Sequence, residues 1–356
     1  MSSQIEIKMA STVAPEESPC APPELHESFT SPIMLFCHGF MSVIIFASFY
    51  LSYCAMEKLK KQNVFGMSTK ILLQSSIVNG VVHQATTAFI RVRALYHAIR
   101  FFRDPCSIQF PSASCFCEGI LYYHTNLFCS VVCLSLFLDR LASFYIHKFY
   151  KSVPKKAAYT FIVIQILIPA LVLCWVFHDA IYTGYVPLCN YPPKNSSEKF
   201  YIVNATRIGI LWIIAAASIV HFYQSFRHEK RIIHEKYDTN ARYNAFENLL
   251  SSRAVCWIIC IQAVCLGGTS AIPSIFKIYR GSIPTAWFHG AIAFATGLTY
   301  ANFFVPIVIT FETNRIIRLR RSRIQALRRQ TNDYDYIHDF KALMESSYKK
   351  VHPKTS

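Results

Sequence analysis

Uncharged polar side chains recur inside the long apolar stretches of this 356-residue sequence. Amide and imidazole groups both donate and accept hydrogen bonds, so in apolar surroundings they either bond to one another between helices or bind a polar ligand. The full set is Asn79, His83, Gln84, His124, Asn126, Gln165, Gln262 and Asn302, with Glu118 at the edge of one stretch. The candidate ligand-binding residues among them are Asn79, His83, His124, Asn126 and Gln262.

The acid–arginine pair Asp139-Arg140 ends one of these stretches and is a second candidate for chemistry. Such a pair is either a simple cap, with the arginine reaching toward lipid phosphates, or a switch in which the arginine exchanges its acid for another partner. An ion pair at a wetted surface contributes only about 0 to 1 kcal/mol, so a ligand that favours one state by about 1 to 3 kcal/mol can overturn it. We expect Arg140 to act as a switch held by Asp139, with Glu247 as a further acidic partner.

Residue patterns typical of enzymes and metal sites are missing from the sequence. It contains no Ser-His-Asp, paired-carboxylate or His-Glu-x-x-His pattern and no glycine loop that could bind phosphate. Two cysteine pairs, Cys129/Cys133 and Cys256/Cys260, are four residues apart, but no histidines with zinc spacing accompany them. We therefore expect no enzyme activity, no metal site and no cofactor. The apolar stretches also lack the carboxylates that ion-coupled transporters place near the middle of the membrane.

The elements that must position these residues are long apolar helices. Of all residues, 53% are hydrophobic and only 16% are charged, whereas about 25% are charged in an ordinary soluble domain. Seven stretches without Lys, Arg, Asp or Glu are each long enough for a helix to cross a hydrocarbon core of about 30 Å, a length that disfavours a soluble bundle. We expect an all-α fold, a bundle of seven transmembrane helices at about 33–56, 71–90, 117–138, 157–178, 207–226, 254–278 and 286–311. Pro169, Pro273 and Pro306 should kink three of them.

The distribution of basic residues predicts the orientation, because cytoplasmic flanks hold an excess of positive charge. Residues 57–70, 139–156, 227–253 and 312–356 together carry 26 of the 36 Lys and Arg residues. The N-terminal tail 1–32 should therefore lie outside the cell and the tail 312–356 in the cytoplasm. Because this excess sits at helix ends, it indicates contact with membrane lipids and no affinity for nucleic acid. Within the second tail, residues 314–329 have the composition of an amphipathic helix on the membrane surface.

Glycosylation sequons and cysteines also gather on the predicted outer side. Two sequons, at Asn195 and Asn204, fall in the loop after the fourth helix. Cys189 lies in the same loop, in a compartment that favours disulfides. We expect Cys189 to bond to Cys115, with Cys117 and Cys106 as rival partners.

Together these features resemble G-protein-coupled receptors, and most closely the nematode serpentine receptors of class alpha and their alpha-beta, beta and epsilon relatives. The resemblance covers roughly residues 60 to 330 and rests on four ordered motifs: Ser68-Thr69-Lys70-Ile71-Leu72-Leu73 leading to His83-Gln84, Asp104-Pro105-Cys106, Leu138-Asp139-Arg140-Leu141-Ala142-Ser143-Phe144, and Ala241-Arg242-Tyr243-Asn244-Ala245-Phe246-Glu247-Asn248. Those families commonly have Glu before the arginine, where this chain has Asp139. The rhodopsin-like Asn-Pro-x-x-Tyr motif is replaced by Asn302-Phe303-Phe304-Val305-Pro306.

The resemblance implies a chemosensory receptor in the plasma membrane of sensory neurons. Such a receptor would bind a small-molecule chemical ligand on its outer side and a heterotrimeric G protein at its inner face. The alternative is a seven-helix transporter or channel, which would need a continuous polar pathway through the bundle. A structural or trafficking membrane protein would need neither feature.

Overall fold

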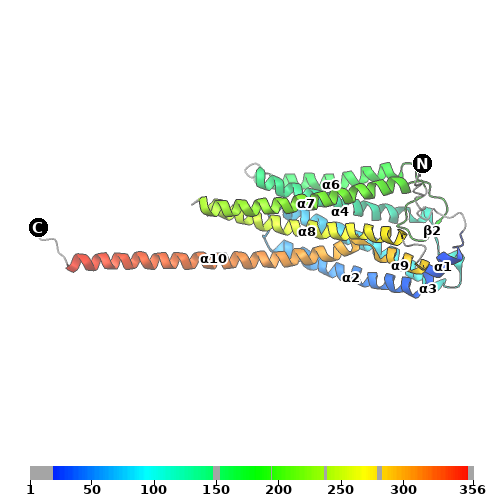
Figure 1. Ribbon diagram of the computed structural model, residues 1–356, viewed down its shortest axis with the longest axis horizontal. Coiled ribbons are helices and arrows are strands. Elements are labelled where there is room, and N and C mark those ends of the chain that lie inside the picture. The colour runs from blue at the N-terminus through cyan, green and yellow to red at the C-terminus, as the bar shows by residue number, and fades with distance from the viewer. Residues whose placement is uncertain (1–18, 147–152, 194, 236–238, 279–282, 352–356) are drawn as a thin grey trace, which may run out of the picture. The chain divides into compact units, whose positions relative to one another are not determined.

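The computed structural model describes residues 19–146, 153–193, 195–235, 239–278 and 283–351. It is built almost entirely of helices (Figure 1). They are α1 (Pro23–Thr30), α2 (Pro32–Lys61), α3 (Met67–Arg100), α4 (Phe116–Tyr145), α6 (Pro154–Phe177), α7 (Ser197–Glu235), α8 (Thr239–Ile278), α9 (Thr285–Phe294) and α10 (Gly297–Val351). Two 3-10 turns, Pro105–Ser107 and Ser112–Cys115, and strands β1 (Phe110–Pro111) and β2 (Tyr185–Val186) lie between helices.

The chain divides into two compact units, Met1–Thr310 and Phe311–Ser356. The first unit contains α1 to α9 and the beginning of α10, and its helices pack as a bundle in which α3 contacts α2, α4 and α6 while α7 contacts α4 and α8. The second unit is the remainder of α10. The predicted surface segment 314–329 is helical and belongs to this long helix.

The ends of α2 show how the sequence delimits a helix. Ser31 is the N-cap, its hydroxyl accepts a hydrogen bond from the backbone N–H of Met34 at 3.3 Å, and Pro32 occupies the first helical position, where its missing N–H costs nothing. Lys58, Lys60 and Lys61 lie in the last turn, where positive charge is favoured by the helix dipole. The same lysines belong to the basic excess found at this end of the bundle.

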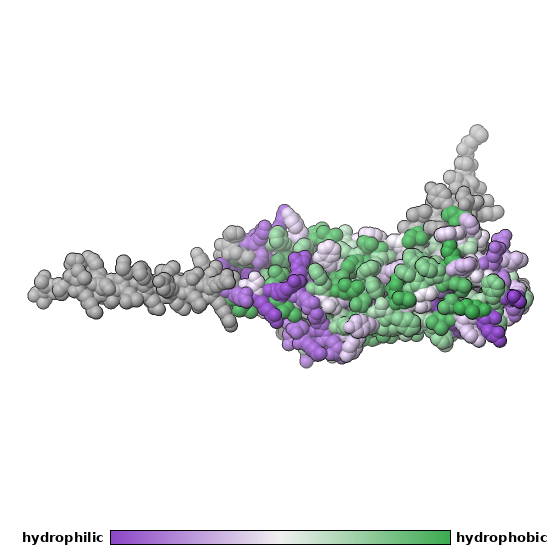
Figure 2. Space-filling view, turned by 90° about the horizontal axis from the view of Figure 1, so that it is seen from below, coloured by the Kyte–Doolittle hydropathy of each residue, from purple (hydrophilic) through white to green (hydrophobic). Residues whose placement is uncertain are grey.

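Apolar side chains cover the outside of the first unit. Figure 2 shows hydrophobic residues gathered over the middle of the bundle and hydrophilic residues toward its ends. Large exposed side chains on the outside include Phe36, Val43 and Phe46 of α2, Val163, Leu167 and Leu171 of α6, and Ile213 and Val220 of α7. An apolar surface of this extent on a monomer is typical of a protein that lies in lipid.

Six helical segments within the described residues are long and apolar enough to cross a membrane. They are Pro32–Lys61, Ser112–Tyr145, Pro154–Phe177, Ser197–Ile232, Arg242–Thr269 and Thr285–Gln325. α3 is not among them, and its buried residues include the polar Ser76, Asn79, His83, Thr87 and Arg91. These groups find partners inside the bundle, so α3 is buried by its neighbours without being strongly apolar itself.

The helix expected at 286–311 is interrupted, so this part of the prediction is wrong. α9 ends at Phe294, and α10 begins at Gly297 after a two-residue break at Ala295 and Thr296. Gly297 is required there, because a Cβ at this position would clash with the backbone oxygen of Cys265 in α8. The break thus coincides with a close approach of two helix backbones.

Other helices extend beyond their predicted bounds. The region 227–253, expected as a loop, is mostly helical, because α7 continues to Glu235 and α8 begins at Thr239. α4 continues past Leu138 to Tyr145, and α3 continues past Ile90 to Arg100. The tail 1–32 contains α1, which packs against α9 and α2, whereas residues 1–18 lie outside the described residues. The expected ends at 90, 138, 226 and 254 were each set by a neighbouring charged residue, but a helix does not have to end where charged residues begin.

Candidate functional site

The polar residues of α3 include a regular series, Asn79, His83, Thr87 and Arg91, which we term the α3 polar stripe. Residues four apart lie on one helical face, so the stripe extends for about 18 Å along a single side of α3. All four side chains are buried. The stripe therefore faces the interior of the bundle.

Two of the predicted ligand-binding residues meet at one threonine of α4. The Asn79 side-chain amide donates to the backbone oxygen of Thr125 at 3.0 Å, and His83 Nδ1 lies 2.9 Å from the Thr125 hydroxyl. The other ring nitrogen of His83 lies 3.3 Å from the Thr87 hydroxyl, and its ring centroid is 5.1 Å from that of Tyr122. Asn79 and His83 are therefore held in fixed orientations at the α3–α4 interface.

The other three predicted residues lie elsewhere. His124 is half-buried and reaches toward α6, with Nε2 3.4 Å from the Ile166 backbone oxygen. Asn126 accepts hydrogen bonds from Arg207 of α7 through both its side-chain and its backbone oxygen. Gln262 of α8 contacts two cysteines of α4, accepting from Cys133 Sγ at 2.5 Å and donating to Cys129 Sγ at 3.4 Å. The five residues do not converge on one point.

The expected uncharged interior is wrong at two positions, Arg91 and Arg207. Arg91 is buried at the end of the α3 polar stripe, where it donates to the Ala293 backbone oxygen at 2.7 Å and to the Thr296 hydroxyl at 3.1 Å. Arg207 of α7 is half-buried and donates to Asn126 and Asn204. Sequence reasoning missed both because each arginine was taken as the boundary of a charge-free stretch. The four-residue spacing from Asn79 is the signal that could have found Arg91.

Two disulfides gather at one end of the bundle, which we term the disulfide end. Cys115, just before α4, is bonded to Cys189, the pair expected from the sequence. A second bond, Cys20–Cys106, was not expected, and it ties the segment before α1 to the loop after α3. Strand β1 pairs antiparallel with β2 between these bridges. The loop that follows α6 is thereby fastened across the start of α4.

Arg93 links the disulfide end to α3. Its guanidinium forms an ion pair with Glu118 at 2.5 Å and lies 3.3 Å from the sulfur of Cys189. The same group lies over the ring of Phe110, 4.3 Å from its centroid, which is a cation–π arrangement. One side chain therefore contacts α4, the disulfide and β1.

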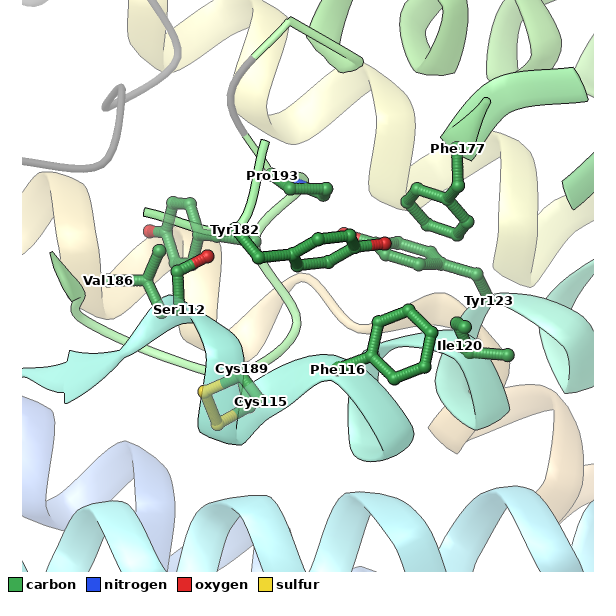
Figure 3. A pocket seen from close by; sticks show the side chains of 12 residues that line it. Ser112, Cys115, Phe116, Ile120, Tyr123, Phe177, Tyr182, Val186, Cys189 and Pro193 are labelled. Atoms are coloured by element: carbon green, nitrogen blue, oxygen red, sulfur yellow. A yellow bond between two sulfur atoms is a disulfide. The ribbon is translucent and has the colours of Figure 1, made fainter. Parts of the chain in front are cut away.

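A small, partly open pocket lies beneath the fastened loop, between the start of α4 and the end of α6 (Figure 3). Aromatic side chains dominate its lining, with Phe116 and Tyr182 in edge-to-face contact at 5.0 Å and the rings of Tyr123 and Phe177 5.8 Å apart. Burial raises the pKa of Tyr191, which also lines the pocket, to about 12, so its phenol is neutral at physiological pH. The lining of this pocket is therefore aromatic and closely packed.

The acid–arginine pair lies at the other end of α4, which we term the lock end. A straight helix over Phe116–Tyr145 is about 45 Å long. Arg140 donates to Asp139 at 2.6 Å, and the hydroxyl of Thr69 in α3 donates to the same carboxylate oxygen at 2.7 Å while accepting from Arg140. All three side chains are buried. The expectation of a wetted, weakly held pair is therefore wrong, because α3 covers it.

Glu247, the further acid expected to hold Arg140, lies in α8 beside Asn248. The hydrogen bonds that Arg140 makes here go to Asp139 and Thr69. One link between α4 and α8 at this end is made by Ser143, whose hydroxyl donates to the Asn248 side-chain oxygen at 3.2 Å.

The two sequon asparagines differ in their surroundings. Asn195 is exposed in the connection before α7 and has a positive φ of 68°, a conformation that asparagine tolerates better than most residues. Asn204 lies within α7, and its side-chain oxygen accepts a hydrogen bond from Arg207 at 2.6 Å. The amide of Asn195 is thus the more accessible of the two.

Comparison with known proteins finds one family over nearly the whole chain. The family described as serpentine type 7TM GPCR chemoreceptor Sra matches residues 16–343. Serpentine receptor class alpha-29 of Caenorhabditis elegans is 45% identical over 317 residues, which cover 88% of this chain and 91% of that protein. Class alpha-28 of the same organism is 43% identical over 92% of this chain and 96% of its own length, and class alpha-31 is 44% identical over 91% and 94%.

Proposed function

Because the chain belongs to the Sra family of serpentine seven-transmembrane chemoreceptors, we propose that it is a chemosensory receptor that binds a small molecule at its disulfide end and signals to a heterotrimeric G protein at its lock end. The relatives and the membrane helices make it a multi-pass membrane protein of the receptor type, and its family is not one of enzymes. The proposed location is the plasma membrane of a sensory neuron.

The proposed topology has seven crossings, with α3 as the seventh. α3 is long enough for a crossing at 34 residues, and Asn79, His83, Gln84 and Arg91 each form a hydrogen bond to a neighbouring helix or to the break before α10. Of the 36 Lys and Arg residues, 26 lie in residues 57–70, 139–156, 227–253 and 312–356, the last of which is mostly the later part of α10. Two of the other ten, Arg91 and Arg207, lie inside the bundle, which makes the imbalance between the two ends larger. This imbalance supports a cytoplasmic lock end and an outer disulfide end.

One observation carries the proposed mechanism: α3 contacts both ends. At the disulfide end it supplies Arg91 and Arg93, and at the lock end it supplies Thr69, which bonds to Asp139 and Arg140. A ligand that moves α3 far enough to change its side-chain contacts would therefore alter the hydrogen bonds among Thr69, Asp139 and Arg140, which we term the lock. Small shifts of packed helices are an established way of coupling two sites.

Arg140→Ala tests this proposal in cells that express the receptor with a second-messenger readout. The receptor is first screened against small chemicals to find an agonist. We expect the variant to lose most of the agonist response at equal surface density, because the group that would engage the G protein is gone. Lys155→Ala, which removes an exposed cation near the start of α6, is the matched control and should signal normally. Normal signalling by Arg140→Ala would refute the role of the lock.

A further inference from the structure

The short helix α1 lies at the disulfide end of the bundle, where it packs against α9 and α2 (Figure 1). One apolar cluster joins α1 to α2, α3 and α9 and includes Leu25, Phe29, Cys37, Ala94 and Ala293. The first two of these residues belong to α1 and the other three to the helices that it covers. Without α1, the bundle residues of this cluster would therefore lose part of their cover.

Two covalent links fasten α1, one at each of its ends. Ser31 alone separates α1 from α2, and its backbone is extended, with a ψ of 145°. Before α1, Cys20 is bonded to Cys106, and the backbone N–H of Ala21 donates to the Pro105 oxygen at 2.9 Å. A single extended residue between two helices can serve as a hinge. We term the Cys20–Cys106 disulfide the latch.

The helix α1 is too short to be stable alone. It has eight residues, whereas isolated helices shorter than about 12 to 15 residues are marginal in water. Its contacts with α9 include the rings of Phe29 and His289, whose centroids are 5.7 Å apart, and a hydrogen bond from the Ser28 hydroxyl to the Thr285 backbone oxygen at 3.4 Å. The latch favours these contacts because it keeps α1 at a high effective concentration beside the bundle.

The two disulfides differ in their access to solvent. Cys115 and Cys189 are 5% and 3% exposed, whereas Cys106 is exposed and Cys20 is half-buried. The rate of thiol–disulfide exchange depends on whether a thiolate can reach a sulfur of the bond. The latch is therefore the bond that a dissolved thiol should open first.

Polar contacts of Arg91 border the apolar cluster beneath α1. The guanidinium donates to the backbone oxygen of Ala293 at 2.7 Å, and its Nη1 lies 3.4 Å from Nδ1 of His38. Ala293 belongs to the cluster, and His38 follows its member Cys37 in α2. Movement of α1 away from the cluster would thus bring water toward hydrogen bonds that join α3 to α9.

We propose that α1 is a movable lid, hinged at Ser31 and held shut by the latch, that controls access of water and solutes to the interior of the disulfide end. This inference goes beyond the proposed function and does not depend on it. In the proposed receptor, the lid would lie on the route of a ligand that arrives at the disulfide end.

Two native cysteines can report on the lid. Cys37 is free, 9% exposed and part of the cluster beneath α1. Cys133 is free and 0% exposed, and it contacts Gln262 between α4 and α8, so it reports on opening of the bundle as a whole. The purified full-length protein in a neutral detergent is labelled with a sulfonated maleimide, a charged reagent that stays in water. Mass spectrometry of its peptides gives the rate at each cysteine.

Removal of the latch should open the lid without opening the bundle. We expect the double substitution Cys20→Ser and Cys106→Ser to raise the labelling rate of Cys37 by about 10- to 100-fold, because the link no longer keeps α1 close. The labelling rate of Cys133 should stay unchanged. Cys117→Ser removes a free, exposed thiol from the same end of the bundle and is the control.

Packing can be weakened while the latch stays intact. Phe29→Ala removes a ring from the cluster and should raise the labelling rate of Cys37 by a smaller factor than loss of the latch. Glu27→Gln changes an exposed residue of the same helix and should leave the rate unchanged.

The unmodified protein provides a second measurement, which decides the question if the double variant does not fold. Dithiothreitol closes to its cyclic disulfide and passes two electrons and two protons to the latch, which becomes two thiols. After brief treatment and removal of the reductant, Cys20, Cys106 and Cys37 should be labelled before Cys115 and Cys189.

Three outcomes would overturn the proposal. They are an unchanged labelling rate of Cys37 once the latch is absent, an equal rise at Cys37 and Cys133, which would indicate a general loss of stability, and reduction of the Cys115–Cys189 bond before the latch. The experiment contains neither ligand nor G protein, so its failure leaves the proposed receptor function untouched.

Discussion

At the scale of single residues, the hydroxyl of Thr69 joins α3 to the ion pair of α4. It donates to Asp139 and accepts from Arg140. Removing one partner of a buried ion pair costs about 3 to 5 kcal/mol, whereas removing a hydrogen bond to a charged group costs about 1.5 to 3 kcal/mol. The lock can therefore be weakened in two steps of different size.

Substitution of this lock should raise signalling in the absence of ligand. Thr69→Val removes the hydroxyl and keeps the shape, so we expect basal second-messenger output to rise by about tenfold or more, since about 1.4 kcal/mol corresponds to a factor of ten. Asp139→Asn should raise it at least as much. Thr160→Val, an exposed threonine of α6, is the control. Unchanged basal output in both lock variants at equal surface density would contradict the proposed restraint.

Glycan attachment should distinguish the two sequons. We expect Asn195→Gln to abolish most of the mobility shift that glycosidase treatment produces, because Asn195 is exposed outside a helix. Asn204→Gln should have little effect, because this amide is bonded to Arg207 within α7. Gel mobility of membrane-inserted protein measures both. A shift that depends on Asn204 alone would contradict this assignment, and a shift that survives the double variant would contradict an outer loop.

At the scale of elements, the two disulfides close long loops at one end of the bundle. The residues joined are 74 and 86 positions apart. Loop-closure entropy in the unfolded chain gives each bond about 4 kcal/mol of stabilisation. Removing the Cys115–Cys189 bond also frees the loop between α6 and α7, which we term the strap, above the aromatic pocket.

Cys189→Ser should therefore lower the thermal midpoint and weaken any ligand that depends on the pocket. Cys20→Ser should lower the midpoint by a similar amount with less effect on that ligand. The Cys20–Cys106 bond ties the segment before α1 to the loop after α3, and neither cysteine lines the pocket. Thermal unfolding and ligand titration on the same samples compare the two. Equal loss of ligand affinity in both variants would show that the strap has no special role.

The sequence predicted helices well and their limits poorly, for a physical reason. Apolar content marks which segment can face lipid, so the expected segments are helical apart from the break within 286–311. A charged residue marks the point where a helix reaches water only if its side chain is not hydrogen-bonded inside the bundle. Arg91 and Arg207 do form hydrogen bonds inside the bundle, so they did not mark helix ends. The break before Gly297 escaped for a related reason, since it depends on the approach of α8, which no local pattern reveals. The meeting of Asn79 and His83 at Thr125 likewise required the register between two helices.

At the scale of the whole molecule, charge is arranged along the chain as the proposed orientation requires. Residues 312–356 carry 11 basic residues, and those from Arg315 to Arg323 alternate with Ile316, Ile317 and Leu319. Arg315 lies 3.7 Å from Glu312 within this unit. A helix of this composition binds anionic lipid through about 1 kcal/mol per basic residue near the surface.

A peptide of residues 314–329 should accordingly bind vesicles that contain phosphatidylserine and gain helicity on binding. Affinity should fall by about an order of magnitude or more when salt rises from 0.05 to 0.5 M, because screening shortens the reach of each charge. Circular dichroism and vesicle sedimentation measure the two effects. A peptide with the same composition but scrambled order is the control for amphipathicity, and equal binding to neutral vesicles would contradict the prediction.

The polarity of α3 has a consequence for biosynthesis. A single arginine in the middle of a nascent membrane segment raises the free energy of insertion by about 2.5 to 3.5 kcal/mol, and α3 adds Asn79, His83 and Gln84 to this cost. In the proposed topology α3 would therefore not leave the translocon for lipid by itself. It would be retained beside α2 until α4 has been synthesised and Thr125 can receive Asn79 and His83. A ribosome-bound chain that ends before α4 should thus leave α3 unintegrated.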